Sequence, residues 1–285
     1  MTIQRISVLG AGAMGHGIAQ VAAQAGFRTT LYDIEQHLVD GGCDRVEANL
    51  DKGVARGKIT EEAKATTLSN LSGTTELAVA AETDLVIEAI PERIDLKRQV
   101  FGELDAAAPA DCLFASNTSS LSIAEIAAAT GRPERVLGMH FFNPVHIMAL
   151  VEIVVHDHTS EATLGSAREV AAAMGKTAIV VKDAPGFATS RLGIVLGLEA
   201  MRMVEQGVAS VEDIDTAMEL GYRHPMGPLK LTDLVGLDVR LDIAVYLHEK
   251  LGSDAFDPPA LLRQMVDEGK LGKKSGQGFY DWTEE

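Results

Sequence analysis

Hydrophobic positions divide the chain into two stretches with different periodicity. Up to about residue 184, short apolar runs alternate with longer amphipathic segments, which is typical of strands and helices that follow one another in an α/β fold. Beyond Pro185 and Gly186 the apolar positions recur at helical spacing only. We therefore expect an α/β domain at residues 1–184 and an all-α C-terminal domain at residues 185–285.

The apolar runs of the first domain are expected to form strands of one sheet. They cover residues 6–9, 29–32, 113–115 and 177–181, and the runs TDLVIEAI (ending near Ile90), RVLGMHFFN and ALVEIVV. Residues 36–69 are polar with helical periodicity and a turn near Gly57, so they predict an inserted helical pair, longer than an ordinary β–α link. In the second domain, helices are predicted at residues 192–204, 211–220, 229–251 and 259–266.

A glycine motif follows the first predicted strand. Gly10, Gly12 and Gly15 have GxGxxG spacing, and a helix pattern then opens before a second strand. In this order the glycines allow a tight turn, close approach of the backbone to a pyrophosphate, and close packing of helix on strand. The helix N-terminus adds amide donors and partial positive charge. The segment predicts a Rossmann-type dinucleotide-binding domain whose cofactor contacts include Gly10, Gly12, Ala13, Met14 and Gly15.

Asp33 indicates which dinucleotide this domain is expected to bind. A carboxylate at the end of the second strand can bond the ribose hydroxyls and repels a 2′-phosphate, so we expect NAD and not NADP.

The formal net charge of −16 disfavours nucleic acid and anionic membranes as partners. No apolar run is long enough to cross a membrane, and a strand pattern begins by Ile3, so we expect a cytoplasmic protein. Cys43 and Cys112 form no metal-binding motif, and no metal is expected.

The run GMHFFNPVHIMALVEIVVHDH contains four of the chain's eight histidines, and an acid, Glu152, lies within its apolar strand pattern. A buried carboxylate is costly unless it is paired, and His140, near the end of the preceding strand, is the expected partner. A carboxylate bound to one ring nitrogen stabilises the imidazolium, so the other nitrogen can take a proton from an alcohol. The alternative is a core histidine with an unrelated acid. The other three, His146, His156 and His158, are expected to be solvated.

Eight motifs in order resemble one family. GAGAMG, EAIPE, NTSSLSI, HFFNPV, LVEIV, DAPGF, HPMGPL and LGKKSGQGFYDW together resemble the L-3-hydroxyacyl-CoA dehydrogenases, most of all the bacterial members that act on 3-hydroxybutyryl-CoA. The resemblance covers essentially the whole chain. It implies reversible, NAD-dependent oxidation of a 3-hydroxyacyl-CoA to the 3-ketoacyl-CoA, by a homodimer formed largely through the C-terminal helices.

The resemblance also implies roles for individual residues. His140 would be the general acid/base, Glu152 its orienting partner, and Ser119 a hydrogen-bonding partner of the reacting oxygen. Contacts to the nicotinamide half of the cofactor are expected from Glu92, Lys97, Asn117 and Asn143, and Lys274 is expected to reach toward the cofactor. In the inserted helical pair, Asn49 and Arg56 are expected to contact coenzyme A. The basic residues of this pair equally fit a solvated helical face: Arg45, Lys52, Arg56, Lys58 and Lys64.

One residue departs from the family pattern. Ser190, in PGFATSR, stands where the family commonly has an asparagine that holds the substrate. We still expect Ser190 to contact the substrate, since the loss of one orienting hydrogen bond costs only on the order of 1 kcal/mol.

Two other functions of the whole protein stay open. A dehydrogenase of a free hydroxy acid, such as a sugar acid or carnitine, would use the same cofactor, whereas a non-catalytic NAD-binding scaffold would have no need of a histidine paired with a buried acid.

Overall fold

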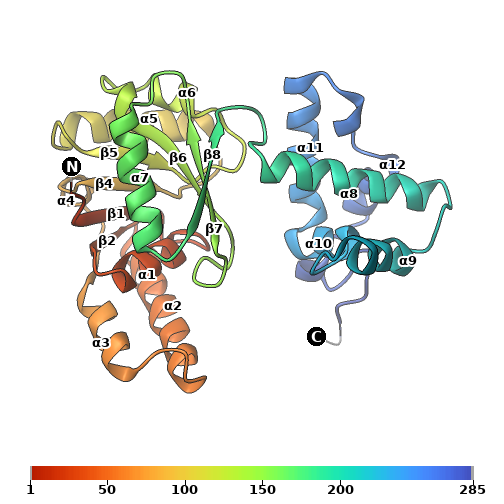
Figure 1. Ribbon diagram of the computed structural model, residues 1–285, viewed down its shortest axis with the longest axis horizontal. Coiled ribbons are helices and arrows are strands. Elements are labelled where there is room, and N and C mark those ends of the chain that lie inside the picture. The colour runs from red at the N-terminus through yellow and green to blue at the C-terminus, as the bar shows by residue number, and fades with distance from the viewer. Residues whose placement is uncertain (1, 284–285) are drawn as a thin grey trace. The chain divides into compact units, whose positions relative to one another are not determined.

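The computed structural model describes residues 2–283 and separates into two compact units, Met1–Asp183 and Ala184–Glu285 (Figure 1). The first unit contains a mostly parallel sheet with helices and the second is helical, which confirms the predicted fold class. Among the described residues, no helix combines the length and the hydrophobicity that crossing a bilayer requires.

Eight strands form one sheet in the first unit. Their order is β3-β2-β1-β4-β5-β6-β7-β8, in which the first six are parallel and the last two run in the opposite direction. The strand order reverses between β1 and β4, and ligands of such sheets bind outside the carboxyl ends of the strands at this point. The strands are β1 (Arg5–Leu9), β2 (Arg28–Tyr32), β3 (Leu71–Thr74), β4 (Leu85–Glu88), β5 (Leu113–Ser116), β6 (Val136–Phe141), β7 (Leu150–Val155) and β8 (Thr177–Lys182).

Helices cover both faces of this sheet. Figure 1 shows α7 and α5 on opposite faces. Helices α1 and α7 share one apolar core with the strands, in which Ile18, Val170 and Val8 are buried. The near-continuous apolar runs in the strands therefore follow from burial on both faces. The helices are α1 (Gly15–Gln24), α4 (Leu77–Ala81), α5 (Ile94–Ala107), α6 (Ile123–Ala127) and α7 (Glu161–Ala173).

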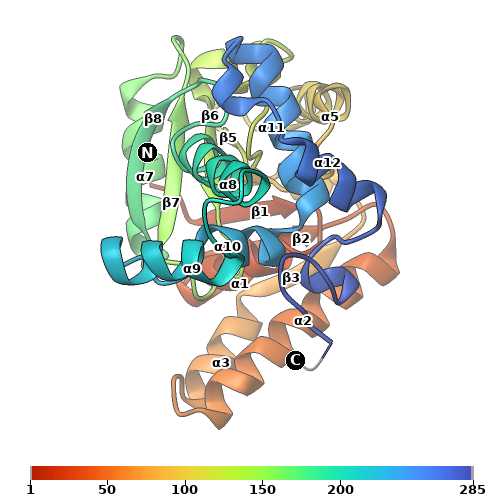
Figure 2. The same cartoon turned by 90° about the vertical axis from the view of Figure 1, so that its right-hand side faces the viewer.

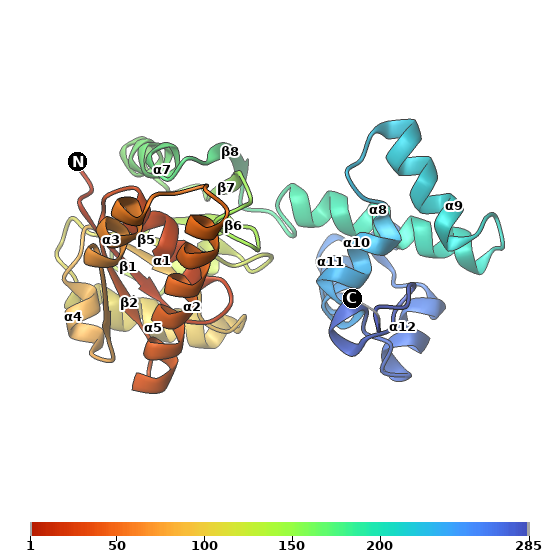
Figure 3. The same ribbon diagram turned by 90° about the horizontal axis from the view of Figure 1, so that it is seen from below.

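Two further helices of the first unit, α2 (Gln36–Ala55) and α3 (Glu61–Ser69), form an arm that runs out beyond the sheet. They lie side by side in Figures 2 and 3. The turn between them contains Gly57 at φ 64°, a conformation that glycine adopts without steric cost. Thr60 then caps α3, because its side-chain oxygen accepts a hydrogen bond from the Ala63 amide at 3.1 Å.

Two strands end earlier than the sequence predicts. β4 ends at Glu88 and not near Ile90, because the Ile90 amide donates to the Glu88 carboxylate (2.7 Å) and not to a neighbouring strand. β6 ends at Phe141, before the predicted end at Asn143, because the Phe141 amide donates to the side chain of Asn117 (2.8 Å). In both cases a side chain replaces the next strand as the hydrogen-bond partner.

The second unit packs its helices around an apolar core that includes Leu198, Met201, Leu229 and Leu247. The prediction of one helix over residues 229–251 is wrong, because two helices meet at Gly236. Its φ of 104° interrupts a right-handed helix and is tolerated because glycine has no side chain. The helices are α8 (Thr189–Glu205), α9 (Val211–Thr216), α10 (Pro228–Val235), α11 (Leu237–Leu251) and α12 (Ala260–Asp267).

Candidate active site

The glycine loop lies between β1 and α1, at the carboxyl end of β1. Gly10 has φ 96°, and a Cβ there would lie 2.6 Å from the carbonyl oxygen of Ala89. A Cβ on Gly15 would lie 1.6 Å from the carbonyl oxygen of Gly10, whereas a Cβ on Gly12 would have no heavy atom within 4 Å. Positions 10 and 15 therefore admit only glycine, and the exposed backbone at Gly12 leaves space for a ligand.

Asp33, at the end of β2, fixes this loop from the other side. Its carboxylate accepts hydrogen bonds from the amides of Ala11 (2.7 Å) and Ile34 (2.8 Å). The exposed Ala13 and the half-buried Met14 lead directly into α1. A helix N-terminus beside a carboxylate is the arrangement expected for a pyrophosphate next to an unphosphorylated ribose.

A buried ion pair lies at the carboxyl end of β4. Glu88 and Lys97 are 0% and 1% exposed, and their side chains form a hydrogen bond of 2.6 Å. The second oxygen of Glu88 accepts a hydrogen bond from the Ser116 hydroxyl (2.6 Å), and Lys97 also donates to the Ile90 carbonyl (3.3 Å). Family resemblance predicts Lys97 at the cofactor, but the sequence gives no sign of its partner Glu88, because only the folded turn after β4 brings the two together. The Lys97 ammonium is thus held by acceptors of the protein itself.

Glu92 connects this buried pair to the loop that carries Ser119. Its carboxylate accepts hydrogen bonds from the Thr118 hydroxyl (2.5 Å) and the Ser119 amide (3.0 Å). The second oxygen of Glu92 lies 3.3 Å from Lys97 Nζ. The Glu92 carboxylate therefore holds the loop after β5 in place, and the same carboxylate faces the Lys97 ammonium.

Asn117 ties the ends of three neighbouring strands together. Its backbone amide donates to the Glu88 carbonyl (2.7 Å), and its side-chain oxygen accepts from the Phe141 amide (2.8 Å). Asn143 is exposed in the loop after β6. The carboxyl ends of β4, β5 and β6 thus bring three predicted cofactor positions, at residues 92, 117 and 143, to the sheet edge that carries the glycine loop.

His140 and Glu152 face each other across the antiparallel strands β6 and β7. The strand register places them opposite one another, and Nδ1 of His140 lies 2.7 Å from Oε2 of Glu152. The two residues are 6% and 0% exposed. The Phe142 ring lies 4.5 Å from the imidazole, measured between ring centres. The predicted pair is present, and its length is that of a charge-assisted hydrogen bond.

The other three histidines of this segment differ from one another. His146 and His158 are exposed, as predicted. The prediction of a solvated His156 is wrong, since this residue is 7% exposed and its Nε2 lies 3.1 Å from the Pro133 carbonyl oxygen. The carbonyl belongs to a segment 23 residues earlier, and sequence periodicity gives no sign of such a partner.

A cavity of about 400 Å³ lies between α1, the arm and the loop after β6. Asn49 and Arg56, the two predicted contacts of coenzyme A, both line it. Lys52 and Lys58 line the same cavity, so three basic side chains border it. The Asn49 amide nitrogen donates to Gln20 at 3.1 Å, which fixes the orientation of this asparagine.

Two other basic residues of the arm, Lys64 and Arg45, form contacts away from this cavity. Lys64 forms an ion pair with Asp51 (2.5 Å), and Arg45 donates to the Ala11 carbonyl (2.6 Å). Lys64 therefore fits the alternative of a solvated helical face, and Arg45 supports the glycine loop. The basic residues at positions 52, 56 and 58 fit an anionic ligand.

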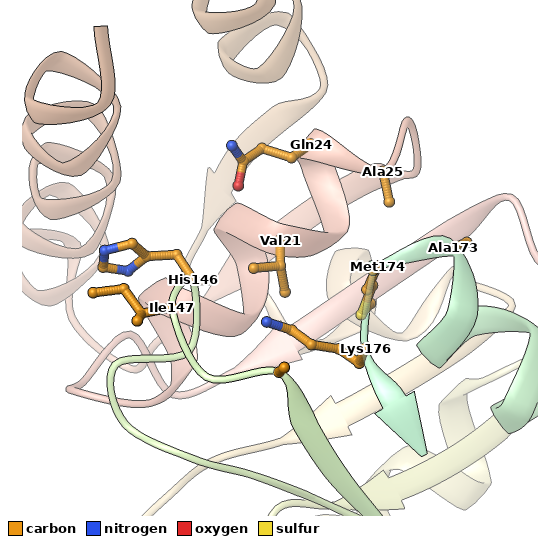
Figure 4. A pocket seen from close by; sticks show the side chains of 10 residues that line it. Val21, Gln24, Ala25, His146, Ile147, Ala173, Met174 and Lys176 are labelled. Atoms are coloured by element: carbon orange, nitrogen blue, oxygen red, sulfur yellow. The ribbon is translucent and has the colours of Figure 1, made fainter. Parts of the chain in front are cut away.

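A second cavity, of about 370 Å³, adjoins the first. The two share three lining residues, Gln24, His146 and Ile147. In Figure 4 the side chain of Lys176 reaches toward Val21. Its Nζ donates to the carbonyls of Val145 (2.5 Å) and Met148 (2.8 Å), and burial lowers the pKa of this ammonium. Lys176, which sequence analysis misses, thereby holds the loop that borders both cavities.

Two predicted site residues belong to the helical unit. Ser190 lies in the first turn of α8. Lys274 lies near the end of the chain and forms an ion pair with Asp238 (2.5 Å). The other predicted site residues belong to the first unit.

Comparison with known proteins gives consistent matches along the whole chain. The family model of the 3-hydroxyacyl-CoA dehydrogenase, NAD binding domain, matches residues 5–184, and that of the 3-hydroxyacyl-CoA dehydrogenase, C-terminal domain, matches residues 186–282. The probable 3-hydroxybutyryl-CoA dehydrogenase of Bacillus subtilis is 46% identical over 284 residues, which cover 100% of this chain and 99% of the relative.

Two solved structures show the same fold at high identity. Mycobacterium tuberculosis FadB2 has a TM-score of 0.95 and 44% identity, with 99% of each chain covered. The (S)-3-hydroxybutyryl-CoA dehydrogenase PaaH1 from Ralstonia eutropha has a TM-score of 0.95 and 40% identity, again with 99% of each chain covered. The glycine loop and the His140–Glu152 pair both lie inside the shared span.

Proposed function

This chain belongs to the 3-hydroxyacyl-CoA dehydrogenase family, and from that membership we propose that it interconverts 3-hydroxybutyryl-CoA and acetoacetyl-CoA with NAD as cofactor. The observation that carries the proposal is the buried hydrogen bond of 2.7 Å between His140 and Glu152, on a strand of the sheet that also carries the glycine loop. A proton-transferring group and a dinucleotide site together are what oxidation of an alcohol requires.

The residues at this sheet edge fit NAD. The open space at Gly12 suits a pyrophosphate, and Asp33 presents a carboxylate where a 2′-phosphate would be repelled. When bound, NAD supplies the hydride acceptor. The adenosine and pyrophosphate half is assigned to Gly10, Gly12, Ala13, Met14, Gly15 and Asp33. The nicotinamide half is assigned to Glu92, Asn117 and Asn143, with Lys97 acting through Glu92.

His140 handles the proton in this scheme. Glu152 holds Nδ1, so Nε2 is the atom that takes the proton of the 3-hydroxyl while C3 gives up a hydride. The buried carboxylate stabilises the imidazolium that results. Ser119, whose loop is fixed by Glu92, is assigned as a hydrogen-bonding partner of the 3-oxygen. In the reverse direction the imidazolium returns the proton to the oxygen of the ketone.

The cavity at the arm supports a coenzyme A thioester as substrate. Arg56, Lys52 and Lys58 border it, and guanidinium and ammonium groups are the usual partners of phosphates. We assign Asn49 and Arg56 to the nucleotide end of coenzyme A. Because the protein carries a net charge of −16, such a local cluster is needed to attract an anionic substrate.

A dehydrogenase of a free hydroxy acid is the second candidate. It would use the same His140–Glu152 pair, but its substrate has no nucleotide phosphates for the basic residues of the arm cavity to bind. The cavity therefore favours the thioester. A non-catalytic scaffold does not account for an acid that is fully buried against a histidine.

The test compares acetoacetyl-CoA with free acetoacetate, and NADH with NADPH, by following NADH or NADPH absorbance. We expect efficient reduction of acetoacetyl-CoA by NADH and a value of kcat/KM at least tenfold lower with acetoacetate or with NADPH. Arg56→Ala should raise the KM for acetoacetyl-CoA about tenfold, which corresponds to about 1.4 kcal/mol. Lys64→Ala, which removes a basic residue paired with Asp51, is the matched control. Equal or better reduction of free acetoacetate would contradict the proposal.

We also propose that the protein is a cytoplasmic homodimer formed through the helical unit. This unit exposes several large apolar side chains: Leu192, Leu220, Tyr222, Leu231, Leu234, Val235 and Val239. Exposed apolar surface of this kind is typical of an interface. Light scattering should give twice the chain mass of 30.3 kDa, and a monomer at micromolar concentration would contradict the assignment.

A further inference from the structure

His146, in the loop after β6, lies where two cavities of the first unit meet. Its side chain lines the arm cavity, between α1, the arm and this loop, and it also lines the second cavity, as do Gln24 and Ile147. Figure 4 shows the side chains of His146 and Lys176 at the second cavity. The proton transfer assigned to His140 makes no use of this second ring. His146 is therefore an additional titratable group at the border of the cavity assigned to coenzyme A.

The charged groups that act on His146 are bases from three different elements. They are His16 of α1, Lys52 of α2 and Lys176 of the segment before β8, and each of them disfavours a proton on the ring. Two more basic residues of the arm, at positions 56 and 58, line the arm cavity. The loop thus places a histidine against a concentration of positive charge.

The acids of the neighbouring elements do not offset this charge. Within the described part of the chain, no acid lines either cavity. Helix α1 has the sequence GHGIAQVAAQ, without an acid. On α2, Glu47 and Asp51 form ion pairs with Lys64, which lines neither cavity. The positive charge around His146 is therefore available to an anionic ligand.

The protonation of His146 is coupled to such a ligand. Burial foremost, and then repulsion by the three bases, lowers the pKa of His146 below its usual 6.5, so the ring is mostly neutral at neutral pH when no ligand is bound. A phosphate beside the ring would favour the imidazolium and raise this pKa. By linkage, the gain in affinity is fully present below the pKa of the free protein and is lost as the pH rises through the higher pKa of the complex.

We propose that His146 binds a phosphate of coenzyme A as the imidazolium, so that the protein binds coenzyme A thioesters more tightly in slightly acid than in slightly alkaline solution. This inference rests on the proposed function, from which it takes the assignment of the arm cavity to coenzyme A. An imidazolium donates a charge-assisted hydrogen bond, which is about twice as strong as a neutral one. Lys52 and Arg56 line the same cavity and supply the permanent charge that the histidine supplements.

The test is isothermal titration calorimetry with coenzyme A at about pH 6 and about pH 8, on either side of the usual pKa of histidine. The 3′-phosphate of coenzyme A gains negative charge over the same range, since its second pKa is about 6, so the native protein is compared with His146→Gln. We expect the ratio of Kd at the higher pH to Kd at the lower pH to be about fivefold larger for the native protein. Titrations in two buffers of different ionisation enthalpy should also show that the native protein takes up more protons on binding than His146→Gln.

Two further variants separate charge from other effects of substitution. His146→Arg keeps a cation at both pH values, so it should bind coenzyme A more tightly than the native protein at the higher pH. His158→Gln removes an exposed histidine that lines neither cavity, and as the matched control it should keep the native ratio. An unchanged ratio in His146→Gln, or a ratio that falls equally in His158→Gln, would overturn the role of His146.

A thioester without phosphates tests which group His146 contacts. At the lower pH, His146→Gln should raise the KM for acetoacetyl-CoA about fivefold and leave the KM for acetoacetyl-pantetheine unchanged. Equal effects on the two substrates would overturn the contact with a phosphate.

The outcomes also separate this inference from the proposed function. Calorimetry requires no turnover, so normal turnover of acetoacetyl-CoA with the same Kd ratio in the native protein and His146→Gln overturns the role of His146 alone. A native protein that neither binds coenzyme A nor reduces acetoacetyl-CoA overturns both.

Discussion

At the scale of single residues, the chemistry assigned to this chain depends on one hydrogen bond. Glu152 is fully buried, and Nδ1 of His140 is its partner at 2.7 Å. A carboxylate in this position orients the ring and stabilises the imidazolium that forms when Nε2 takes a proton. The histidine alone would supply a proton acceptor, but the acid determines which nitrogen accepts and how stable the resulting cation is.

Replacing the acid should therefore impair catalysis while sparing the cofactor. We expect Glu152→Gln, which keeps the shape and one hydrogen bond but removes the charge, to lower kcat on the order of 100-fold. Steady-state kinetics with acetoacetyl-CoA, together with NADH binding followed by fluorescence, would measure both effects. Asp157→Asn, at an exposed acid just after β7, is the control. Native turnover in Glu152→Gln would exclude the role assigned to this carboxylate.

Closeness along the chain is not enough to predict a residue pair from sequence, because the pattern must also show that a charged side chain is buried. His140 and Glu152 are separated by one short turn, and the cost of burying an acid in an apolar strand indicates a nearby partner. The hydrogen bond between Glu88 and Lys97 escapes the same reasoning because a lysine on an amphipathic helix is expected to reach solvent, whereas Lys97 lies on the buried face of α5 with Phe101 and Leu104. The contact of His156 with a carbonyl depends on how distant segments pack, which periodicity does not reveal.

At the scale of elements, residues 279–282 are fixed to α10 by one buried carboxylate. Asp233 is 1% exposed and accepts three hydrogen bonds, from the backbone amides of Phe279 (2.9 Å) and Tyr280 (2.8 Å) and from the indole of Trp282 (2.9 Å). A Cβ on Gly278 would lie 2.2 Å from the Asp233 carboxylate, so the glycine is required for this approach. The motif GQGFYDW is therefore structural in this part.

We predict that Asp233→Asn destabilises the protein. The amide of asparagine has one acceptor oxygen in place of two, so a donor that the carboxylate now satisfies is left buried without a partner. The expected loss is about 3 kcal/mol in the free energy of unfolding, measured by denaturant titration. Asp281→Asn, an exposed acid of the same segment, should change stability little. Equal effects of the two substitutions would contradict the structural role of Asp233.

Hydrophobic periodicity predicts the long helices and strands well. It fails where a single residue ends a helix or where a strand lies at the edge of the sheet. The break between α10 and α11 depends on a single glycine, Gly236, inside an otherwise continuous helical pattern. The strand β3, with the sequence LSGT, was not predicted because it has little apolar character. It lies at the edge of the sheet and pairs only with β2, so burial does not demand apolar residues on both of its faces.

At the scale of the whole molecule, the change from strand and helix to helix alone is visible in the hydrophobic pattern, and this is why the fold class could be predicted. The site is less predictable, because its residues come from the ends of several strands and from loops between them. Motif resemblance supplies those residues, but not the buried contacts that hold them, such as Lys176 beneath the loop after β6.

Asp84 makes the stability of the fold depend on pH in the acid range. Asp84 accepts hydrogen bonds from the backbone amides of Gln4 and Arg5 (2.9 Å each) and from the Arg5 side chain (2.7 Å). Partial burial raises the pKa of this carboxyl, but the hydrogen bonds, that of the Arg5 side chain foremost, outweigh burial and leave the pKa below its usual 3.8. The first strand is thereby fixed beside β4.

The sign of the pH effect follows from the lowered pKa. The stabilisation by Asp84 is fully present above the unfolded-state pKa near 3.8 and is lost as the pH falls through the lower folded-state value. We expect Asp84→Asn to lower the free energy of unfolding by about 1 kcal/mol at pH 7, since the site is partly exposed. In denaturant titrations at several pH values, this difference should shrink below pH 3.8. A difference that grows in acid would contradict the assignment.

The substitution His140→Asn tests whether His140 moves the proton in an NAD-dependent oxidation. The asparagine amide can still donate to Glu152 in place of Nδ1 but has no counterpart of Nε2. Turnover of acetoacetyl-CoA with NADH and the Kd for NADH would be measured on the same preparation. We predict a fall in kcat on the order of 1,000-fold, with a Kd within about twofold of the native value. A kcat within tenfold of the native value would show that another group moves the proton.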